Sequence, residues 1–211
     1  MTIGAGVKVK ICGITNLEDA IIAVGSGCDA LGFIFYKKSL RYIDPKRAHD
    51  IIRLLPSKVI KVGIFVNAKE PFIKRIARMC SLDMLQFHGD ESPEFCGKFK
   101  KYRVIKSFRV KSKLNLQELL RYKVFAYLFD AFSPAKLGGT GRKFNWKYLP
   151  DVRKLGKAVF LAGGLNAANV NKAICAVGPH WVDASSSLEQ YPGKKCKRKL
   201  IAFIKEAKHK I

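Results

Sequence analysis

The feature that most constrains the fold of this chain is an alternation of short apolar runs with helical patterns, repeated eight times along its 211 residues. The apolar runs are rich in β-branched and aromatic residues and end at turn residues, which is typical of strands. We expect strands at residues 7–12, 29–35, 59–66, 84–87, 103–108, 124–130, 158–162 and 181–184. Helices are expected after them at residues 18–25, 45–55, 70–79, 114–121, 146–155, 166–177 and 195–208. A further short helix is expected to begin at residue 92.

Strands that alternate with helices run parallel, because each crossover brings the chain back to the same end of the sheet. Eight such units close most naturally into a (β/α)8 TIM barrel. There is no linker or Pro/Ser-rich boundary, so we expect an α/β protein with a single compact domain over residues 1–211. The alternative is an open doubly wound sheet, but the strand–GxGxxG–helix fingerprint typical of that fold is absent from the sequence.

The composition is that of an ordinary globular protein, with 48% hydrophobic and 27% charged residues. No apolar run approaches the ~20 residues of a membrane helix, and residues 1–6 lack the basic and apolar regions of a signal peptide. The six cysteines are scattered, without a CxxC pair or a Cys/His cluster at zinc spacing. We therefore expect a cytoplasmic protein with reduced thiols, no metal site and no membrane partner.

The unusual property of the sequence is its net charge of +24, from 40 Lys and Arg against 16 Asp and Glu. Such an excess is typical of proteins that bind nucleic acid. Here the basic residues are spread along the whole chain, and the densest runs, 98–101 and 194–199, are short. Because no RRM, KH or zinc-finger signature accompanies the charge, we favour a basic solvated surface over a nucleic-acid site.

Two residues at expected strand ends are candidates for chemistry. In a (β/α)8 barrel the C-terminal ends of all strands meet at the face that holds the active site. Cys12 ends the first strand, and Asp130 ends the sixth, whose sequence VFAYLFD is otherwise apolar. A lone cysteine is more often a small core residue, and Asp130 also fits a loop cap paired with Lys136 or Arg142. The functional interpretation gains weight because other residues should converge there: Arg41, His88, Gly164 and Ser185.

An ordered set of motifs covers nearly the whole chain. The motifs are KICGIT at 10–15, GFIF at 32–35, KSLRYI at 38–43, LQFHG at 85–89, GGTG at 138–141, LAGGL at 161–165 and DASS at 183–186. In this order they resemble the phosphoribosylanthranilate isomerase family. Each motif alone is weak, but the ordered set is specific. The family is a (β/α)8 barrel, which agrees with the strand count.

The resemblance implies an enzyme of tryptophan biosynthesis with a small-molecule phosphosugar–anthranilate substrate, N-(5-phosphoribosyl)anthranilate. The implied reaction is an Amadori rearrangement to 1-(2-carboxyphenylamino)-1-deoxyribulose 5-phosphate. The family assigns the general base to Cys12 and the general acid to Asp130. A thiolate is a competent base when nearby positive charge lowers its pKa, and an apolar setting lets a carboxyl group donate a proton near neutral pH. The reaction is redox-neutral, so we expect no cofactor and no metal.

The resemblance also implies residues that bind the two anionic groups of the substrate. Arg41 corresponds to the residue that binds the anthranilate carboxylate, and its planar guanidinium suits that task. The phosphate is expected at the turns after the seventh and eighth strands. There Gly163 and Gly164 let backbone N–H groups approach an anion, and Ser185 and Ser186 add donors.

The remaining candidates surround the sugar and the aromatic ring. Gln86 and His88 fit the wall of the ring pocket, although His88 equally fits a packed histidine at a strand end. Asp183 fits either a ligand for a ribose hydroxyl or the cap of a turn. Gly139, within the glycine-rich segment 139–141 beside Arg142, suits a lid over the sugar.

Two positions depart from the family pattern. Leu40 stands where the family usually has Pro, and we expect it to loosen one loop only. Ser187 stands where the family usually has Gly, so its Cβ would weaken binding if that position needs a positive φ or a close phosphate; alternatively its hydroxyl adds a donor.

The rival functions are another phosphosugar isomerase on the same barrel and a basic RNA-associated protein. For the assembly we expect a monomer or a homodimer.

Overall fold

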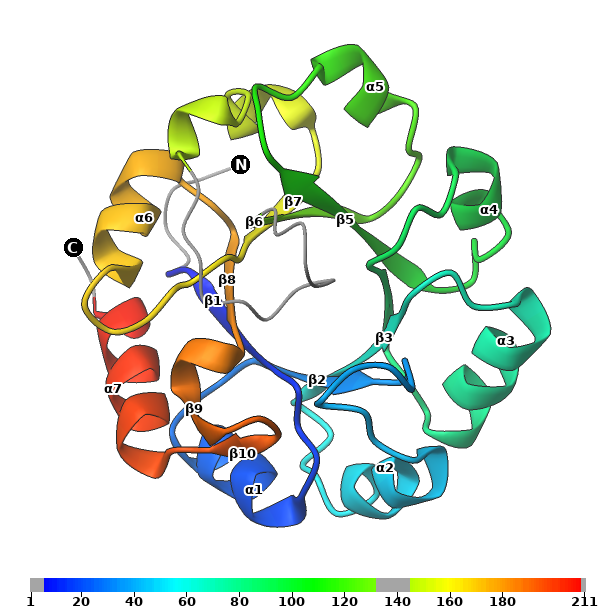
Figure 1. Ribbon diagram of the computed structural model, residues 1–211, viewed down its shortest axis with the longest axis vertical. Coiled ribbons are helices and arrows are strands. Elements are labelled where there is room, and N and C mark those ends of the chain that lie inside the picture. Colours follow the sequence, from blue (N-terminus) through cyan, green and yellow to red (C-terminus); the bar gives the residue numbers. More distant parts are fainter. Residues whose placement is uncertain (1–5, 132–144, 210–211) are drawn as a thin grey trace.

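Eight parallel strands pair in chain order and the eighth pairs with the first, so the sheet closes on itself (Figure 1). The computed structural model describes residues 6–131 and 145–209. The strands are β1 Lys8–Cys12, β2 Ala30–Ile34, β3 Ile60–Phe65, β4 Met84–Phe87, β5 Arg103–Val110, β6 Ala126–Ala131, β7 Ala158–Leu161 and β8 Trp181–Ala184. The (β/α)8 barrel expected from the alternating pattern is confirmed.

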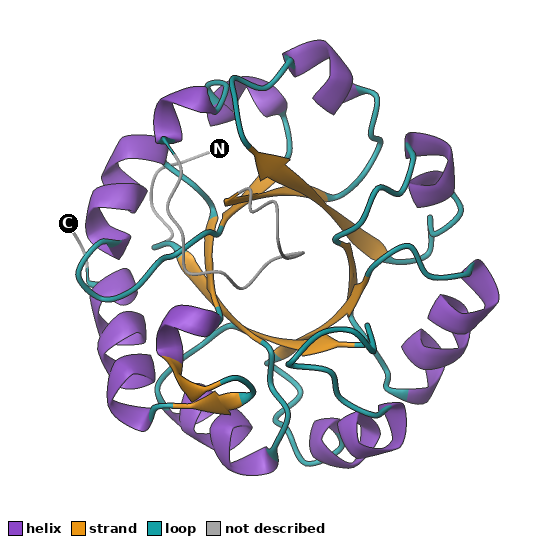
Figure 2. Ribbon diagram, in the orientation of Figure 1, coloured by secondary structure: helices purple, strands orange, loops and turns teal. Residues whose placement is uncertain are grey.

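The helices form a ring outside the strands (Figure 2). They are α1 Leu17–Gly25, α2 Pro45–Ile52, α3 Glu70–Met79, α4 Pro93–Gly97, α5 Leu116–Leu120, α6 Val170–Val177 and α7 Lys197–Lys208. Local capping defines several of their starts: Asn16, Asp44 and Ser92 each accept a hydrogen bond from a backbone N–H of the first turn. These short polar caps end the loops that leave the strands and so fix where each helix begins.

The segment expected as one helix at 146–155 is instead two 3-10 helices, η1 Trp146–Tyr148 and η2 Val152–Leu155. Pro150 explains the interruption, since it has no N–H to donate and forces the preceding residue out of the helical region. Leu149 is accordingly extended, with φ −77° and ψ 142°. Helix α6 also begins later than expected, because Asn169 accepts from the Asn166 N–H and the residues between them form a turn.

A small antiparallel hairpin follows the barrel, and the sequence pattern did not predict it. A short 3-10 helix, η3 Ser186–Leu188, leads from β8 into β9 Glu189–Tyr191, which pairs with β10 Lys194–Lys195. Gly193 turns the chain between the two strands at φ 88°. The hairpin takes Lys195, the first residue of the helix expected at 195–208, and Cys196 is the N-cap, so that α7 begins at Lys197.

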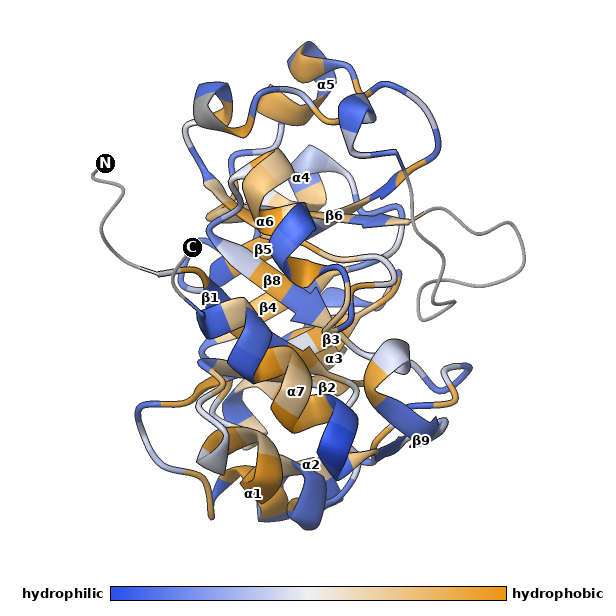
Figure 3. Cartoon of the chain, turned by 90° about the vertical axis from the view of Figure 1, so that its left-hand side faces the viewer, coloured by the Kyte–Doolittle hydropathy of each residue, from blue (hydrophilic) through white to orange (hydrophobic). Residues whose placement is uncertain are grey.

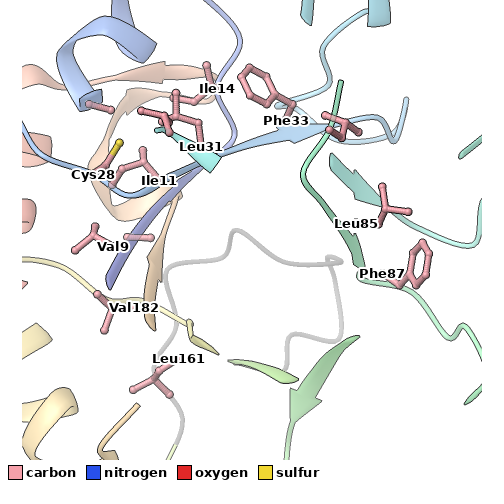
Figure 4. Close-up of a cluster of buried hydrophobic side chains, with 14 of the residues drawn as sticks. Val9, Ile11, Ile14, Cys28, Leu31, Phe33, Leu85, Phe87, Leu161 and Val182 are labelled. Carbon is pink, nitrogen blue, oxygen red and sulfur yellow. The ribbon is translucent and has the colours of Figure 1, made fainter. Parts of the chain in front are cut away.

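Apolar side chains fill two separate spaces. The larger cluster lies between the strands and the surrounding helices, and Figure 4 shows part of it around β1, β2, β4, β7 and β8. Helix α7 contributes Leu200, Phe203, Ile204 and Ala207 to this layer, and its other residues are mostly hydrophilic, apart from Ala202 and the 40% exposed Ile201 (Figure 3). The smaller cluster fills the barrel interior, where the rings of Phe160 and Trp181 stack 4.8 Å apart.

Candidate active site

A pocket of about 770 Å³, counting space open to solvent, lies at the C-terminal ends of the strands. Ten of the residues named from the sequence line it: Cys12, Arg41, Gln86, His88, Asp130, Gly163, Gly164, Asp183, Ser185 and Ser186. They come from chain positions up to 174 residues apart, so the fold brings together what the sequence separates. Gly139, the remaining candidate, lies outside the described residues, as do its neighbour Arg142 and Lys136.

The pocket also has an apolar wall that the motifs did not indicate. Ile34, Ile64 and Val66 line it at the ends of β2 and β3, next to Tyr36. These side chains suit a flat hydrophobic group, such as an aromatic ring, on one side of the pocket. The alternation of side chains along each strand is the signal that could have identified them, because it assigns every second residue to the barrel interior.

Cys12 lies above a buried ion pair. Lys10 precedes it by two residues on β1, so both side chains enter the barrel interior. The Lys10 ammonium lies 2.9 Å from Asp183 Oδ2, on the neighbouring strand β8, and its side chain is fully buried. Burial raises the pKa of the Cys12 thiol, and the positive charge of Lys10 opposes that rise without cancelling it. The free pocket therefore holds Cys12 mainly as a thiol near neutral pH.

The two members of the ion pair respond to burial in opposite senses. Burial alone would lower the pKa of Lys10, but the charge of Asp183 opposes burial and the pKa is raised overall; Cys12 adds to this rise only when it is ionised. Burial raises the pKa of Asp183, and the Lys10 ammonium only partly offsets it. Asp183 Oδ1 is buried and has no hydrogen-bond partner among the described residues. This oxygen is available to a ligand, which favours the ribose-hydroxyl interpretation over a turn cap.

Asp130 faces His88 across the pocket. Its Oδ2 lies 3.4 Å from His88 Nε2, and its Oδ1 accepts from the Ala131 N–H at 2.8 Å. The Gln86 side-chain nitrogen lies 2.9 Å from His88 Nδ1. With the Gln86 amide donating there, Nδ1 accepts, and Nε2 is buried near Asp130 without a hydrogen bond to any described residue. His88 is thus positioned by Gln86 and accompanies Asp130.

Arg41 does not approach the pocket with a free guanidinium. Its Nε and Nη2 donate to the two carboxylate oxygens of Glu189, each at 2.7 Å. This contact occupies one of the two edges that a guanidinium can offer to a carboxylate. A ligand carboxylate would have to use the other edge, formed by Nη1 and Nη2. The expectation that Arg41 binds a carboxylate therefore applies only to the Nη1/Nη2 edge of its guanidinium.

Glu189 and Lys195 are buried charges that sequence reasoning missed. Lys195 Nζ lies 3.1 Å from Glu189 Oε1 and also donates to the Ser185 carbonyl. Burial would raise the pKa of Glu189, but its contacts with Arg41 and Lys195 lower it overall. Burial lowers the pKa of Lys195. The interpretation of the run 194–199 as solvated surface is wrong for Lys195, whose exposure is 3%.

The two turns proposed for phosphate lie next to each other in the pocket. Gly163 and Gly164 have φ values of 90° and 65°, and a Cβ on Gly163 would lie 2.7 Å from the Ala131 nitrogen. These positions therefore require glycine. Ser185 Oγ is buried and has no partner among the described residues, so one donor of this group is unused.

The two departures from the family pattern have different structural outcomes. Ser187 does not need a positive φ, because among described non-glycine residues only Asn67 and Ser81 have one. Its hydroxyl donates to the Leu165 carbonyl and so ties the two turns together. It is therefore not a free donor for a ligand. Leu40 is exposed at 64% on a surface loop.

No group of three or more His, Cys, Asp or Glu in residues 6–131 and 145–209 is arranged to hold a metal ion. No described helix is both long and apolar enough to cross a membrane.

Known proteins resemble this chain in both sequence and fold. The family model described as N-(5'phosphoribosyl)anthranilate (PRA) isomerase matches residues 9–206. The N-(5'-phosphoribosyl)anthranilate isomerase of Citrifermentans bemidjiense is 52% identical over 201 residues, which are 95% of this chain and 97% of the relative. The crystal structure of phosphoribosyl anthranilate isomerase from Thermotoga maritima superposes with a TM-score of 0.90 at 43% identity, covering 96% of this chain and 98% of that one.

A further solved phosphoribosyl anthranilate isomerase holds reduced 1-(o-carboxyphenylamino)-1-deoxyribulose 5-phosphate. It has a TM-score of 0.84 and 42% identity, and the match covers 96% of this chain and 98% of that chain. The family model and these relatives extend over almost the full barrel, including the strand ends that carry the pocket. The chain belongs to the phosphoribosylanthranilate isomerase family.

Proposed function

We propose that this protein isomerises N-(5'-phosphoribosyl)anthranilate to 1-(2-carboxyphenylamino)-1-deoxyribulose 5-phosphate in tryptophan biosynthesis. The observation that carries the proposal is the meeting of a buried thiol, Cys12, and a buried carboxyl group, Asp130, in one pocket with Arg41 and an apolar wall. An Amadori rearrangement needs one proton donor and one proton acceptor, and a substrate with a carboxylate, a ring and a phosphate needs the remaining features.

In the first step Asp130 donates a proton to the ribose ring oxygen. The C1'–O bond breaks, the nitrogen lone pair forms a C=N bond, and the sugar opens to a Schiff base. Asp130 is only 9% exposed and its Oδ2 lies 3.4 Å from His88 Nε2, so little of the carboxyl group faces water. His88 Nε2 is within reach of the same carboxylate and can stabilise the carboxylate that the transfer leaves behind.

In the second step Cys12, as its thiolate, removes the proton from C2'. The electron pair moves into a C1'–C2' double bond and neutralises the iminium nitrogen, which gives an enolamine. Tautomerisation of this enolamine yields the ketone. The base must first become a thiolate, although burial raises the pKa of Cys12. The ammonium groups of Lys10 and Lys195 act against burial and favour that ionisation.

Binding follows from the charges around the pocket. The free edge of Arg41 would receive the anthranilate carboxylate while Glu189 holds the other edge. The backbone at Gly163 and Gly164, with the unused Ser185 hydroxyl, would receive the phosphate. Ser186 lines the same part of the pocket and is proposed as a further donor.

The direct test supplies phosphoribosylanthranilate and follows the loss of its fluorescence. We expect turnover by the wild-type protein, and turnover that falls by ~10² or more in Cys12→Ser and in Asp130→Asn. An aminosugar phosphate that lacks the anthranilate ring serves as the control substrate and should not react. Absence of turnover with a folded wild-type protein would refute the proposal.

The other expectations remain proposals for this protein. They are a cytoplasmic location, a single domain over residues 1–211, and a monomeric or homodimeric assembly without a nucleic-acid partner. The basic charge has a simpler consequence for the proposed enzyme, because a net charge of +24 attracts a substrate that carries both a carboxylate and a phosphate.

A further inference from the structure

Lys10 is an unusual residue for the interior of a barrel. Its side chain is fully buried, although removing an ammonium from water is costly unless it is paired. The pairing is with Asp183, in direct register on the neighbouring strand β8, at 2.9 Å. Because Lys10 and Cys12 are two residues apart on β1, both side chains point into the same interior space.

We propose that Lys10 is a positioning residue for the reaction, whose ammonium is shared between the Asp183 carboxylate and the Cys12 sulfur and stabilises the Cys12 thiolate. The inference rests on the proposed role of Cys12 as the base. The chemical step is an ionisation alone: the thiol releases its proton to water, and Lys10 remains protonated throughout.

The geometry gives Lys10 the capacity for both contacts. An ammonium has three donors, and Asp183 Oδ2 uses one of them. The positive charge of Lys10 holds the pKa of the Cys12 thiol below the level that burial alone would set. No other cation on a barrel strand lines this part of the interior among the described residues; Lys195 approaches from the hairpin.

Other charged groups around the thiol act on it directly or through these partners. Asp183 on β8 raises the pKa of Cys12, and Lys195 on β10 lowers it. Asp130 on β6 and His88 after β4 act on Asp183, whereas Glu189 on β9 and Arg41 in the loop after β2 act on Lys195. Removal of the Asp183 charge should therefore lower the pKa of the Cys12 thiol, whereas removal of the Lys10 charge should raise it.

The competing account is purely structural, with Lys10 serving only to neutralise Asp183. The chain offers a matched control for it. Lys106 is buried at 2% exposure and lies 2.8 Å from Glu91, so it forms a second buried ion pair. It interacts with Cys96, which belongs to the layer between strands and helices, rather than with the barrel interior. Loss of Lys106 should disturb stability as loss of Lys10 does, without touching Cys12.

The experiment measures alkylation of Cys12 by iodoacetamide between pH 7 and pH 10, with the modified residue located by mass spectrometry. The variants are Lys10→Met, Asp183→Asn, the double variant Lys10→Met/Asp183→Asn, and Lys106→Met. The double variant leaves no unpaired buried charge, so it reports on Cys12 even where Lys10→Met alone fails to fold. Thermal unfolding confirms that each protein measured is native.

At pH 8.5 we expect alkylation of Cys12 to be at least tenfold slower in Lys10→Met than in the wild type, which corresponds to about one pKa unit. Asp183→Asn should accelerate it, the double variant should be slower than Asp183→Asn, and Lys106→Met should match the wild type. An alkylation profile in the double variant that coincides with that of Asp183→Asn would overturn the proposal.

This readout is independent of turnover. If Cys12→Ser keeps full activity with phosphoribosylanthranilate, the proposed role of Cys12 fails whatever the alkylation shows. If Cys12→Ser is inactive and the alkylation profile of the double variant coincides with that of Asp183→Asn, only the inference about Lys10 fails.

Discussion

The contact between Glu189 and Arg41 supports a prediction about both stability and substrate binding. Glu189 accepts two hydrogen bonds of 2.7 Å from Arg41 and lies 3.1 Å from Lys195 Nζ. All three side chains are largely buried, at 11% exposure for Arg41, 4% for Glu189 and 1% for Lys195. The substitution Glu189→Gln keeps the shape of the side chain and removes its charge.

The magnitude follows from what the amide cannot do. A glutamine oxygen can still accept from Arg41 Nε, but its NH2 group then faces Nη2, so one charge-assisted hydrogen bond is lost. Such a bond contributes about 1.5–3 kcal/mol, and breaking a buried ion pair costs about 3–5 kcal/mol. We expect the free energy of unfolding to fall by about 3 kcal/mol. With a urea m-value of about 2–3 kcal/mol/M, the unfolding midpoint should drop by about 1 M.

The effect should depend on pH with a defined sign. Arg41 and Lys195 outweigh burial and lower the pKa of Glu189 in the folded protein, so its ionised form contributes stability above the pKa of the unfolded chain. That contribution is lost as pH falls through the folded pKa. The free energy of unfolding should differ most between wild type and Glu189→Gln at pH 7. This difference should shrink below about pH 4.5, the usual range of a glutamate pKa.

The assay is urea unfolding followed by tryptophan fluorescence at pH 7 and at pH 4, combined with steady-state kinetics at pH 7. Glu18→Gln is the matched control, because Glu18 contacts Lys194 at 2.6 Å but is 72% exposed. We expect that control to leave the midpoint almost unchanged. The kinetics should show a higher KM for Glu189→Gln with a smaller change in kcat, since Arg41 loses its fixed orientation. Equal midpoints for Glu189→Gln and Glu18→Gln would refute the reasoning.

Three further predictions concern the pocket. Cys12→Ser should keep the thermal midpoint within a few degrees while kcat falls by ~10² to 10⁴, and a near-wild-type rate would remove Cys12 from the chemistry. Gly13→Ala should lower stability by about 1–2 kcal/mol and raise KM, because Gly13 has φ 77° and a Cβ there would lie 2.8 Å from Arg41 Cδ; an unchanged KM would contradict this account of the loop. Exhaustive chelation should leave turnover unchanged, and a loss restored by a divalent ion would show that the proposed metal-free chemistry is wrong.

The strands were predictable because their signal is local. Short segments bounded by polar and turn residues predicted bounds for β4 and β8 that agree with the structure, and the polar residues at strand ends indicated the pocket. Helix ends were less predictable, since turns at Asn166–Asn169 and the break at Pro150 compete with helical periodicity. The hairpin of β9 and β10 was not predicted from the sequence, because its strands are too short to show alternation.

The charged interior of the site was not predictable from the sequence. Lys10 alternates with apolar residues as a solvent-facing lysine of a half-buried strand would, and its partner Asp183 is 173 residues away. Lys195 lies within a basic run, and Glu189 lies 148 residues from Arg41. Such burial is decided by tertiary contacts that no window of sequence contains. Arg41 is an example: only the structure reveals that Glu189 already occupies one edge of its guanidinium.

The central claim is that Asp130 delivers a proton, and Asp130→Asn tests it most directly. The amide keeps the shape and can still accept from the Ala131 N–H, but it has no carboxyl proton to transfer. We predict that kcat with phosphoribosylanthranilate falls by ~10² or more while KM changes little and the thermal midpoint holds or rises. A kcat within a few-fold of wild type at unchanged KM would contradict the account and would move the acid to a neighbour such as His88.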